Sequence, residues 1–236
     1  MHFNSLATIV GLTSAVVVSA QLSAVHATTA NYQIGSGTTS LNLDLELLED
    51  LGLSFNSASD TVTPANGFSF GFDMLPPSST VLGTDFTFSY DDATDTFTPL
   101  GGTIEHSGSL LFDVDTDKLT LFPTLEIGNF SIGFDGGYFI RDTFSTGLRL
   151  FDLVINTKPV VAGKDLQISD IDLLIAPDFA GLLTNYDPDL SEQLVGTVIG
   201  QASIDAQTVP EPGSVLAILT TASAALALNR QKRKVS

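Results

Sequence analysis

Three aspartates at alternate positions, Asp113, Asp115 and Asp117, form the most suggestive chemical group in the chain. Calcium prefers carboxylate oxygens, and the first half of an EF-hand loop spaces its acidic ligands in this way. The pattern then departs from an EF-hand, because Lys118 stands where the glycine is needed and Thr124 stands where the bidentate glutamate is needed. The group predicts at most an irregular calcium site, and the alternative is the polar tip of a hairpin.

A second acidic group, Asp91, Asp92 and Asp95, has the same two interpretations. Zinc is not indicated, because the chain has no cysteine and its only histidine after residue 27 is His106. A Ser-His-Asp triad would have to use His106 as its base, and we expect no nucleophile elbow beside it. We therefore predict a protein that is not an enzyme, and the alternative is a glycoside hydrolase that uses two of the 27 acidic residues.

The segments that must position these residues have the alternating pattern of strands with one buried face. The alternation is clearest over residues 41–47 and 86–90. Further strands are predicted at 68–72, 109–114, 119–127, 130–134, 138–144, 148–155, 166–175 and 195–205, with hairpin turns at 91–95, 115–117 and 135–137. The sequence therefore predicts an all-β fold, an antiparallel β-sandwich or barrel-like domain.

Few segments depart from the strand pattern. Asp187 as N-cap and Pro188 at the first helical position predict one short helix, and residues 178–183 suggest another turn. Residues 45–51 lose the alternation and could bend into a helix. Residues 35–39, which include two glycines, are expected to form a loop.

The aromatic residues favour a core over a sugar-binding platform. The chain has 16 phenylalanines, four tyrosines and no tryptophan. Alternating residues such as Phe68, Phe70 and Phe72 are typical of a sandwich interior, whereas sugar-binding surfaces usually offer exposed flat rings.

The charge of the chain excludes nucleic acid as a partner. Residues 28–212 contain all 27 acidic residues but only five of the nine basic ones, and phosphate backbones need a basic surface. Without cysteine there are no disulfides, so stability must come from the core or from bound ions.

Both ends of the chain indicate export. Residues 6–20 are apolar and small, and Val25-His26-Ala27 offers small residues for signal peptidase, so we expect a signal peptide over residues 1–27. Near the other end, residues 214–228 carry no charge, and as a helix they would reach only about 22 Å of the roughly 30 Å hydrocarbon core. The flanking residues are a proline motif, Val209-Pro210-Glu211-Pro212, and a basic cluster, Arg230, Lys232, Arg233 and Lys234.

This order of proline motif, short apolar helix and basic end resembles the PEP-CTERM sorting signal of exported bacterial proteins. The resemblance implies recognition by an exosortase, a membrane cysteine protease that cleaves the signal and releases or transfers the protein. We expect Pro210 and Pro212 to hold the chain extended, outside the preceding sheet. The alternative is a membrane anchor that is never cut.

A second resemblance concerns residues 102–135. Their strand-rich layout, which includes Glu105-His106-Ser107-Gly108-Ser109-Leu110, is similar to exported β domains related to the haem-transport module HtaA. Since its haem ligands have no matching residues here, the resemblance transfers no haem site.

The sequence thus predicts a signal peptide (1–27), an extracellular β domain (28–208) and a sorting tail (209–236). We expect an exported cell-surface or extracellular-matrix protein that is structural, with no obligatory cofactor. Its expected partners are signal peptidase, an exosortase-like protease, the membrane through its C-terminal segment, and exopolysaccharide. The alternative is an extracellular binding module for calcium, a glycan or haem.

Overall fold

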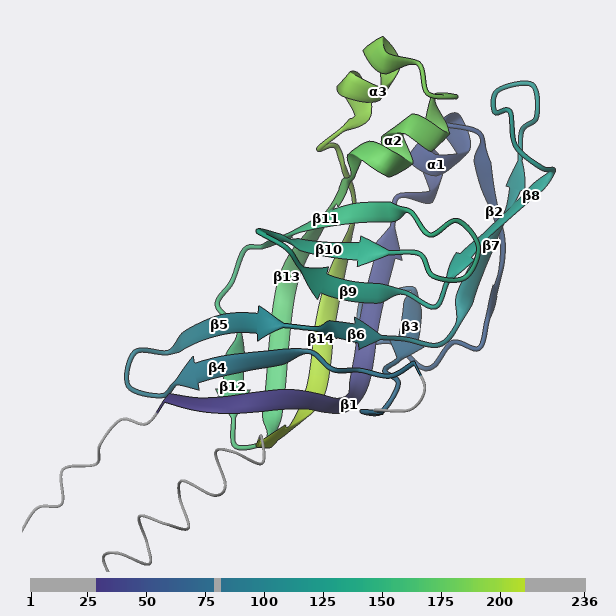
Figure 1. Cartoon of the computed structure of the whole chain (residues 1–236). Coiled ribbons are helices and arrows are strands. Elements are labelled where there is room, and N and C mark those ends of the chain that lie inside the picture. Colours follow the sequence, from purple (N-terminus) through teal and green to yellow (C-terminus); the bar gives the residue numbers. More distant parts are fainter. Residues whose placement is uncertain (1–28, 79–81, 211–236) are drawn as a thin grey trace, which may run out of the picture.

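The computed structural model describes residues 29–78 and 82–210 (Figure 1). The expected signal peptide, Glu211, Pro212 and the basic cluster Arg230, Lys232, Arg233 and Lys234 lie outside the described residues. In the described part, no helix combines the length and the apolar character that a membrane crossing requires.

Most of the described chain forms antiparallel strands. The main sheet contains β1 (Thr29–Leu43), β3 (Phe70–Asp73), β4 (Thr87–Asp91), β5 (Thr96–Gly101), β6 (Thr103–Glu105), β9 (Ser131–Phe134), β10 (Tyr138–Arg141), β11 (Arg149–Ile155), β12 (Val160–Ala162), β13 (Asp165–Ile175) and β14 (Val198–Pro210). A smaller sheet contains β2 (Leu53–Ser59), β7 (Ser109–Val114) and β8 (Thr124–Gly128). The helices are α1 (Leu45–Asp50), α2 (Pro177–Leu183) and α3 (Pro188–Leu194).

The main sheet folds over on itself into a nearly closed barrel. Its strand order is β5-β4-β1-β14-β13-β11-β10-β9-β6, and Figure 1 shows the long strands β1, β13 and β14 crossed by the shorter ones. At the seam, Phe86 N donates to Thr103 O at 3.0 Å, and Ile34 N donates to Phe86 O at 3.0 Å. These bonds join β6 to β1 through the segment before β4.

Phenylalanines fill the interior, as the alternating pattern predicted. Phe72 is 1% exposed and contacts Phe130 edge to face, with 4.9 Å between ring centroids. Phe151 packs in the same way on Phe179 of α2, at 5.7 Å, which fixes that helix over the end of the barrel. Edge-to-face pairs suit the charge distribution of the rings and add stability beyond the buried area.

Several local predictions are confirmed. The strand predicted at 109–114 coincides with β7, and the turns at 91–95 and 135–137 join β4 to β5 and β9 to β10. Asp187 is the N-cap of α3 and accepts bonds from Asp189 N and Leu190 N, with Pro188 at the first helical position. The helix considered at 45–51 is α1 (Leu45–Asp50), so the strand alternation seen over 41–47 holds only as far as Leu43, and Leu45 and Leu47 are helical.

Three local predictions are wrong. Residues 35–39 lie inside β1, because Gly37, with a φ of 151°, lets β1 pass so close to β14 that a Cβ there would stand 2.3 Å from Asp205 O. The strand predicted at 119–127 begins only at Thr124, since Asn185 holds Lys118 O and Thr120 N in a loop.

The third wrong prediction is that the proline motif stays outside the sheet. Val209 and Pro210 end β14 and lie opposite Gln33 and Tyr32 of β1. The pairing of β13 with β14 extends only to Gln207, so Pro210, which has no N–H, has no neighbour on that side.

Both ends of the described chain lie at one end of the barrel. Thr29 pairs with Asp91 of β4, and three residues later Tyr32 pairs with Pro210. Figure 1 shows α1, α2 and α3 at the opposite end. The first and last described residues therefore lie on the side of the barrel away from the helices.

Candidate functional site

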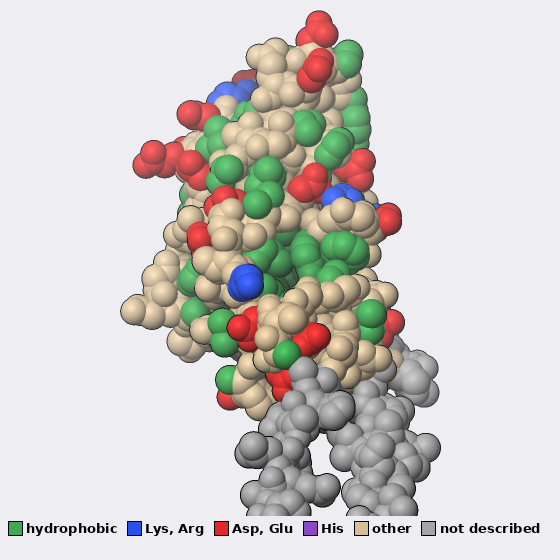
Figure 2. Space-filling model, turned by 90° about the vertical axis from the view of Figure 1, so that its left-hand side faces the viewer, with side chains coloured by type: hydrophobic (Ala, Val, Ile, Leu, Met, Phe, Trp, Pro, Cys, Tyr) green, Lys and Arg blue, Asp and Glu red, His purple; other side chains and the backbone are tan. Residues whose placement is uncertain are grey.

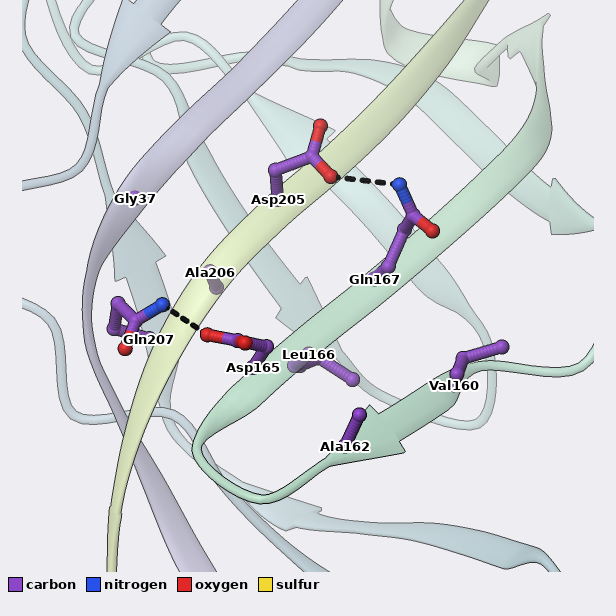
Figure 3. Close-up of a pocket in the computed structure, with 9 residues that line it drawn as sticks. All are labelled: Gly37, Val160, Ala162, Asp165, Leu166, Gln167, Asp205, Ala206 and Gln207. Atoms are coloured by element: carbon purple, nitrogen blue, oxygen red, sulfur yellow. Dashed lines mark hydrogen bonds between the residues drawn. The ribbon is translucent and has the colours of Figure 1, made fainter.

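A groove of about 360 Å³ lies on the outer side of the main sheet, where β12 folds back beside β13 (Figure 3). Its lining residues are Gly37, Val160, Ala162, Asp165, Leu166, Gln167, Asp205, Ala206 and Gln207. The hairpin that joins β12 to β13 brings Val160 and Ala162 beside the polar side chains of β13 and β14. The groove thus combines an aliphatic wall with a polar one.

Two carboxylate and carboxamide pairs form the polar wall. Gln167 Nε2 donates to Asp205 Oδ1 at 3.0 Å, and Gln207 Nε2 donates to Asp165 Oδ1. Both pairs follow from the strand register, which sets Asp165 opposite Gln207 and Gln167 opposite Asp205. Directly opposite residues on antiparallel strands point to the same face, so all four side chains emerge together.

The hydrogen bonds decide what the groove offers a ligand. Each glutamine uses one N–H on its aspartate, which leaves the second N–H, the amide oxygen and the aspartate Oδ2. Acceptor atoms therefore predominate, and none of the lining residues is basic. Such a surface can accept hydrogen bonds from hydroxyl and amino groups.

The sequence carried a partial signal for this site. Asp165 and Gln167 are two residues apart, as are Asp205 and Gln207, and strand residues two apart share one face. Each pair therefore indicates the solvent-exposed face of a strand. The pairing between them depends on a register that joins residues about 40 positions apart, which alternation alone does not give.

Two of the three aspartates predicted as calcium ligands accept hydrogen bonds from other groups of the protein. Asp113 lies in β7 and accepts from Asn56 Nδ2 through both oxygens, at 3.1 and 3.0 Å. Asp115 accepts from Asp117 N at 3.0 Å and lies 4.0 Å from Lys118 Nζ. Between residues 29 and 210, segment 79–81 aside, no three acidic or histidine side chains come close enough to hold a metal ion.

The second acidic group forms a hairpin turn. Asp91 Oδ1 accepts from Ala93 N at 2.9 Å and from Thr94 N at 3.3 Å, which closes the turn after β4. Asp95 accepts from the hydroxyl of Tyr90 at 2.9 Å and has a φ of 50°. Both carboxylates stabilise the local chain direction.

His106 is a core residue, 1% exposed, with both ring nitrogens bonded. Nδ1 lies 2.7 Å from Phe130 O and Nε2 lies 2.7 Å from Thr39 Oγ1. Because a carbonyl only accepts, Nδ1 carries the proton and Nε2 accepts from the threonine hydroxyl. Burial lowers the pKa of His106 from 6.5 to about 4, so the ring is neutral at pH 7.

One motif escaped the sequence analysis: residues 67–71 read Gly-Phe-Ser-Phe-Gly, the pattern of a nucleophile elbow. These residues do not form a nucleophile elbow, because the residue after Ser69, Phe70, begins strand β3 and not a helix. Ser69 Oγ donates to Asn42 Oδ1 at 2.7 Å, and His106 is bonded elsewhere. The motif and the histidine do not form a catalytic pair.

Two buried carboxylates were also missed. Asp142 is fully buried and accepts from Gly128 N at 2.8 Å and from Thr146 N at 2.6 Å, so it ties the loop after β10 to the end of β8. Glu105 Oε1 accepts from the hydroxyls of Thr103 and Ser131, at 2.6 and 2.8 Å. Nothing in the local pattern distinguishes these acids from exposed ones, because their burial depends on loops that pack over them.

Acidic side chains outnumber basic ones on the surface. Figure 2 shows them spread over one face, with few lysine or arginine side chains among them and a central hollow lined by hydrophobic groups. This distribution agrees with the formal net charge of −18. Positively charged ligands are attracted to such a surface, and anionic ones are repelled.

Comparison of the chain with protein-family models, with curated proteins and with solved structures finds no match in any of the three.

Proposed function

We propose that the chain is an exported, non-enzymatic protein of the cell surface or extracellular matrix, sorted by an exosortase-like protease. The structural observation that supports this most is the position of the first and last described residues. Thr29 and Pro210 lie at one end of the barrel, so the leader and the tail that we propose both join the domain there. A domain held through that end presents its helices and sheet faces to the surroundings.

The same geometry affects cleavage. Val209 and Pro210 are held in β14, and Glu211 and Pro212 continue the motif beyond the described residues. We propose that the protease recognises the motif beyond Pro210, the last described residue of β14.

A double substitution tests the sorting role. In the native host, Glu211→Ala with Pro212→Ala alters the motif without touching β14, and we expect the protein to keep its tail and stay in the membrane fraction. Asp189→Ala with Glu192→Ala on α3 is the control, which we expect to be processed normally. Normal processing of the motif variant would refute the proposed sorting.

The groove favours a second role, the capture of a glycan. Carboxylates and carboxamides on one wall suit sugar hydroxyls, and Val160 with Ala162 offers a surface for the C–H face of a ring. We propose that this contact attaches the exported domain to exopolysaccharide.

Cosedimentation with purified host exopolysaccharide tests the second role. We expect the quadruple alanine variant of Asp165, Gln167, Asp205 and Gln207 to lose cosedimentation. The α3 control variant should retain it. Equal cosedimentation of the wild-type protein and the groove variant would refute a glycan role for the groove.

A further inference from the structure

We infer that the groove selects glycan segments with free, protonated amino groups over neutral or acidic ones. This inference rests on the proposed glycan-binding role of the groove and names the chemistry of its ligand. Three features of the described residues carry it: the charge of the lining, its excess of acceptors and the diagonal placement of its two carboxylates.

The charged residues of the lining are all negative. Asp165 and Asp205 are both exposed, and no lining residue carries a positive charge. The structure shows neither aspartate in a salt bridge, and the recorded partner of each carboxylate is a neutral glutamine amide. The groove therefore keeps two negative charges uncompensated by its own side chains.

The unused acceptor atoms of the lining favour a ligand that donates hydrogen bonds and carries a positive charge. With the Gln167 and Gln207 amides turned toward Asp205 and Asp165, Oδ2 of each aspartate is not used in these two hydrogen bonds (Figure 3). Neutral hydroxyl groups can donate to these oxygens, but an ammonium group donates three hydrogen bonds and carries the opposite charge. Charge-assisted hydrogen bonds are about twice as strong as neutral ones.

The register sets the spacing of the carboxylates. Asp165 and Asp205 occupy diagonal positions on β13 and β14, since each lies opposite the glutamine two residues from the other. The Cα atoms of diagonal neighbours in an antiparallel pair are about 7–8 Å apart. We infer that one ammonium group fits between the two carboxylates. A carboxylate-bearing sugar in the same place would meet two like charges.

The remaining lining suits a sugar ring. Val160 and Ala162 face the polar wall from β12, so a ring can rest its C–H face on them while its amino group points to the aspartates. Gly37 of β1 lines the far wall of the groove. The ligand class is thus a polysaccharide that contains glucosamine-like units.

Calorimetry with two matched oligosaccharides tests the inference on the purified full-length protein. The probes are a glucosamine tetramer and its fully N-acetylated counterpart at pH 6, which share a backbone and differ at the nitrogen. We expect the amino form to bind at least tenfold more tightly. Asp165→Asn with Asp205→Asn should lower its affinity at least tenfold, because asparagine keeps the shape and the acceptor for each glutamine but removes the charge.

A charge-matched control separates the groove from the general attraction of an acidic surface. Asp189→Asn with Glu192→Gln removes two negative charges from α3, at the opposite end of the barrel, and should leave the affinity within twofold. Equal losses in the two double variants would overturn the inference. Equal binding of both tetramers, lost in the groove variant, would overturn the amino selectivity but retain a glycan groove, and no binding of either tetramer would also remove support for the glycan role.

Discussion

Because His106 is buried in its neutral form, the free energy of unfolding of the domain should decrease under mildly acidic conditions. Its pKa is about 4 in the folded protein because the ring is buried, against 6.5 in an unfolded chain. As pH falls below 6.5, the unfolded chain gains a proton that the folded protein does not bind. The stability due to neutral His106 is therefore complete above pH 6.5 and is lost as pH falls to about 4.

The magnitude follows from the pKa difference. One pKa unit corresponds to about 1.4 kcal/mol, so between pH 7 and pH 4.5 His106 should remove roughly 2 to 3 kcal/mol from the free energy of unfolding. The carboxylates titrate over part of this range as well. A comparison of the protein with a His106→Gln variant isolates the histidine, because both proteins contain the same acids.

Urea denaturation at pH 7 and at pH 4.5 measures the effect. The glutamine amide can donate to Phe130 O and accept from Thr39, so we expect the variant to fold. We expect its free energy of unfolding at pH 7 to be lower than that of the wild-type protein. The stability of the wild-type protein relative to the variant should fall by roughly 2 to 3 kcal/mol between pH 7 and pH 4.5. A difference that is constant with pH would refute the assignment, as would an NMR titration of His106 in the folded protein with a midpoint near 6.5.

Three further predictions concern the fold and the acidic loops. Asp142→Asn should lower the free energy of unfolding by about 3 kcal/mol, because four backbone N–H groups donate to this buried carboxylate. Exposed Asp135→Asn should change it by less than about 0.5 kcal/mol; equal losses in urea denaturation would contradict the buried role. Gly37→Ala should lower the free energy of unfolding by more than about 2 kcal/mol, because its Cβ would meet Asp205 O at 2.3 Å. Gly136→Ala should lower it by only about 1 kcal/mol, because Gly136 has a φ of 69° but open space around it. Thermal melts that rank the two variants in the reverse order would contradict the register of β1 and β14. Calcium at about 1 mM should give no saturable heat and no shift in melting temperature, because Asn56 engages both oxygens of Asp113; a saturable heat that Asp113→Asn abolishes would restore the calcium site.

Local chemistry made much of the fold predictable. Alternation identified β7 to the residue, and turn residues placed the hairpin at 91–95. The helix that begins at Pro188 followed from its N-cap. These features depend on neighbours within a few positions, and such neighbours are visible in the sequence.

The errors arose where distant contacts override local preference. Gly37 reads as a turn residue, yet the close approach of β14 makes glycine necessary inside a strand. Pro210 reads as a strand breaker, yet it fits the end of β14 because β13 no longer pairs there. The groove needs both the hairpin of β12 and the register of Asp165 with Gln207, so no single segment predicts it.

Intact-mass measurement of the native protein from cell, envelope and medium fractions tests the proposed export and sorting most directly. We predict a form that lacks residues 1–27 and ends near the Pro210-Glu211-Pro212 motif, present in the envelope or the medium. A full-length chain confined to the cytosol would contradict the account.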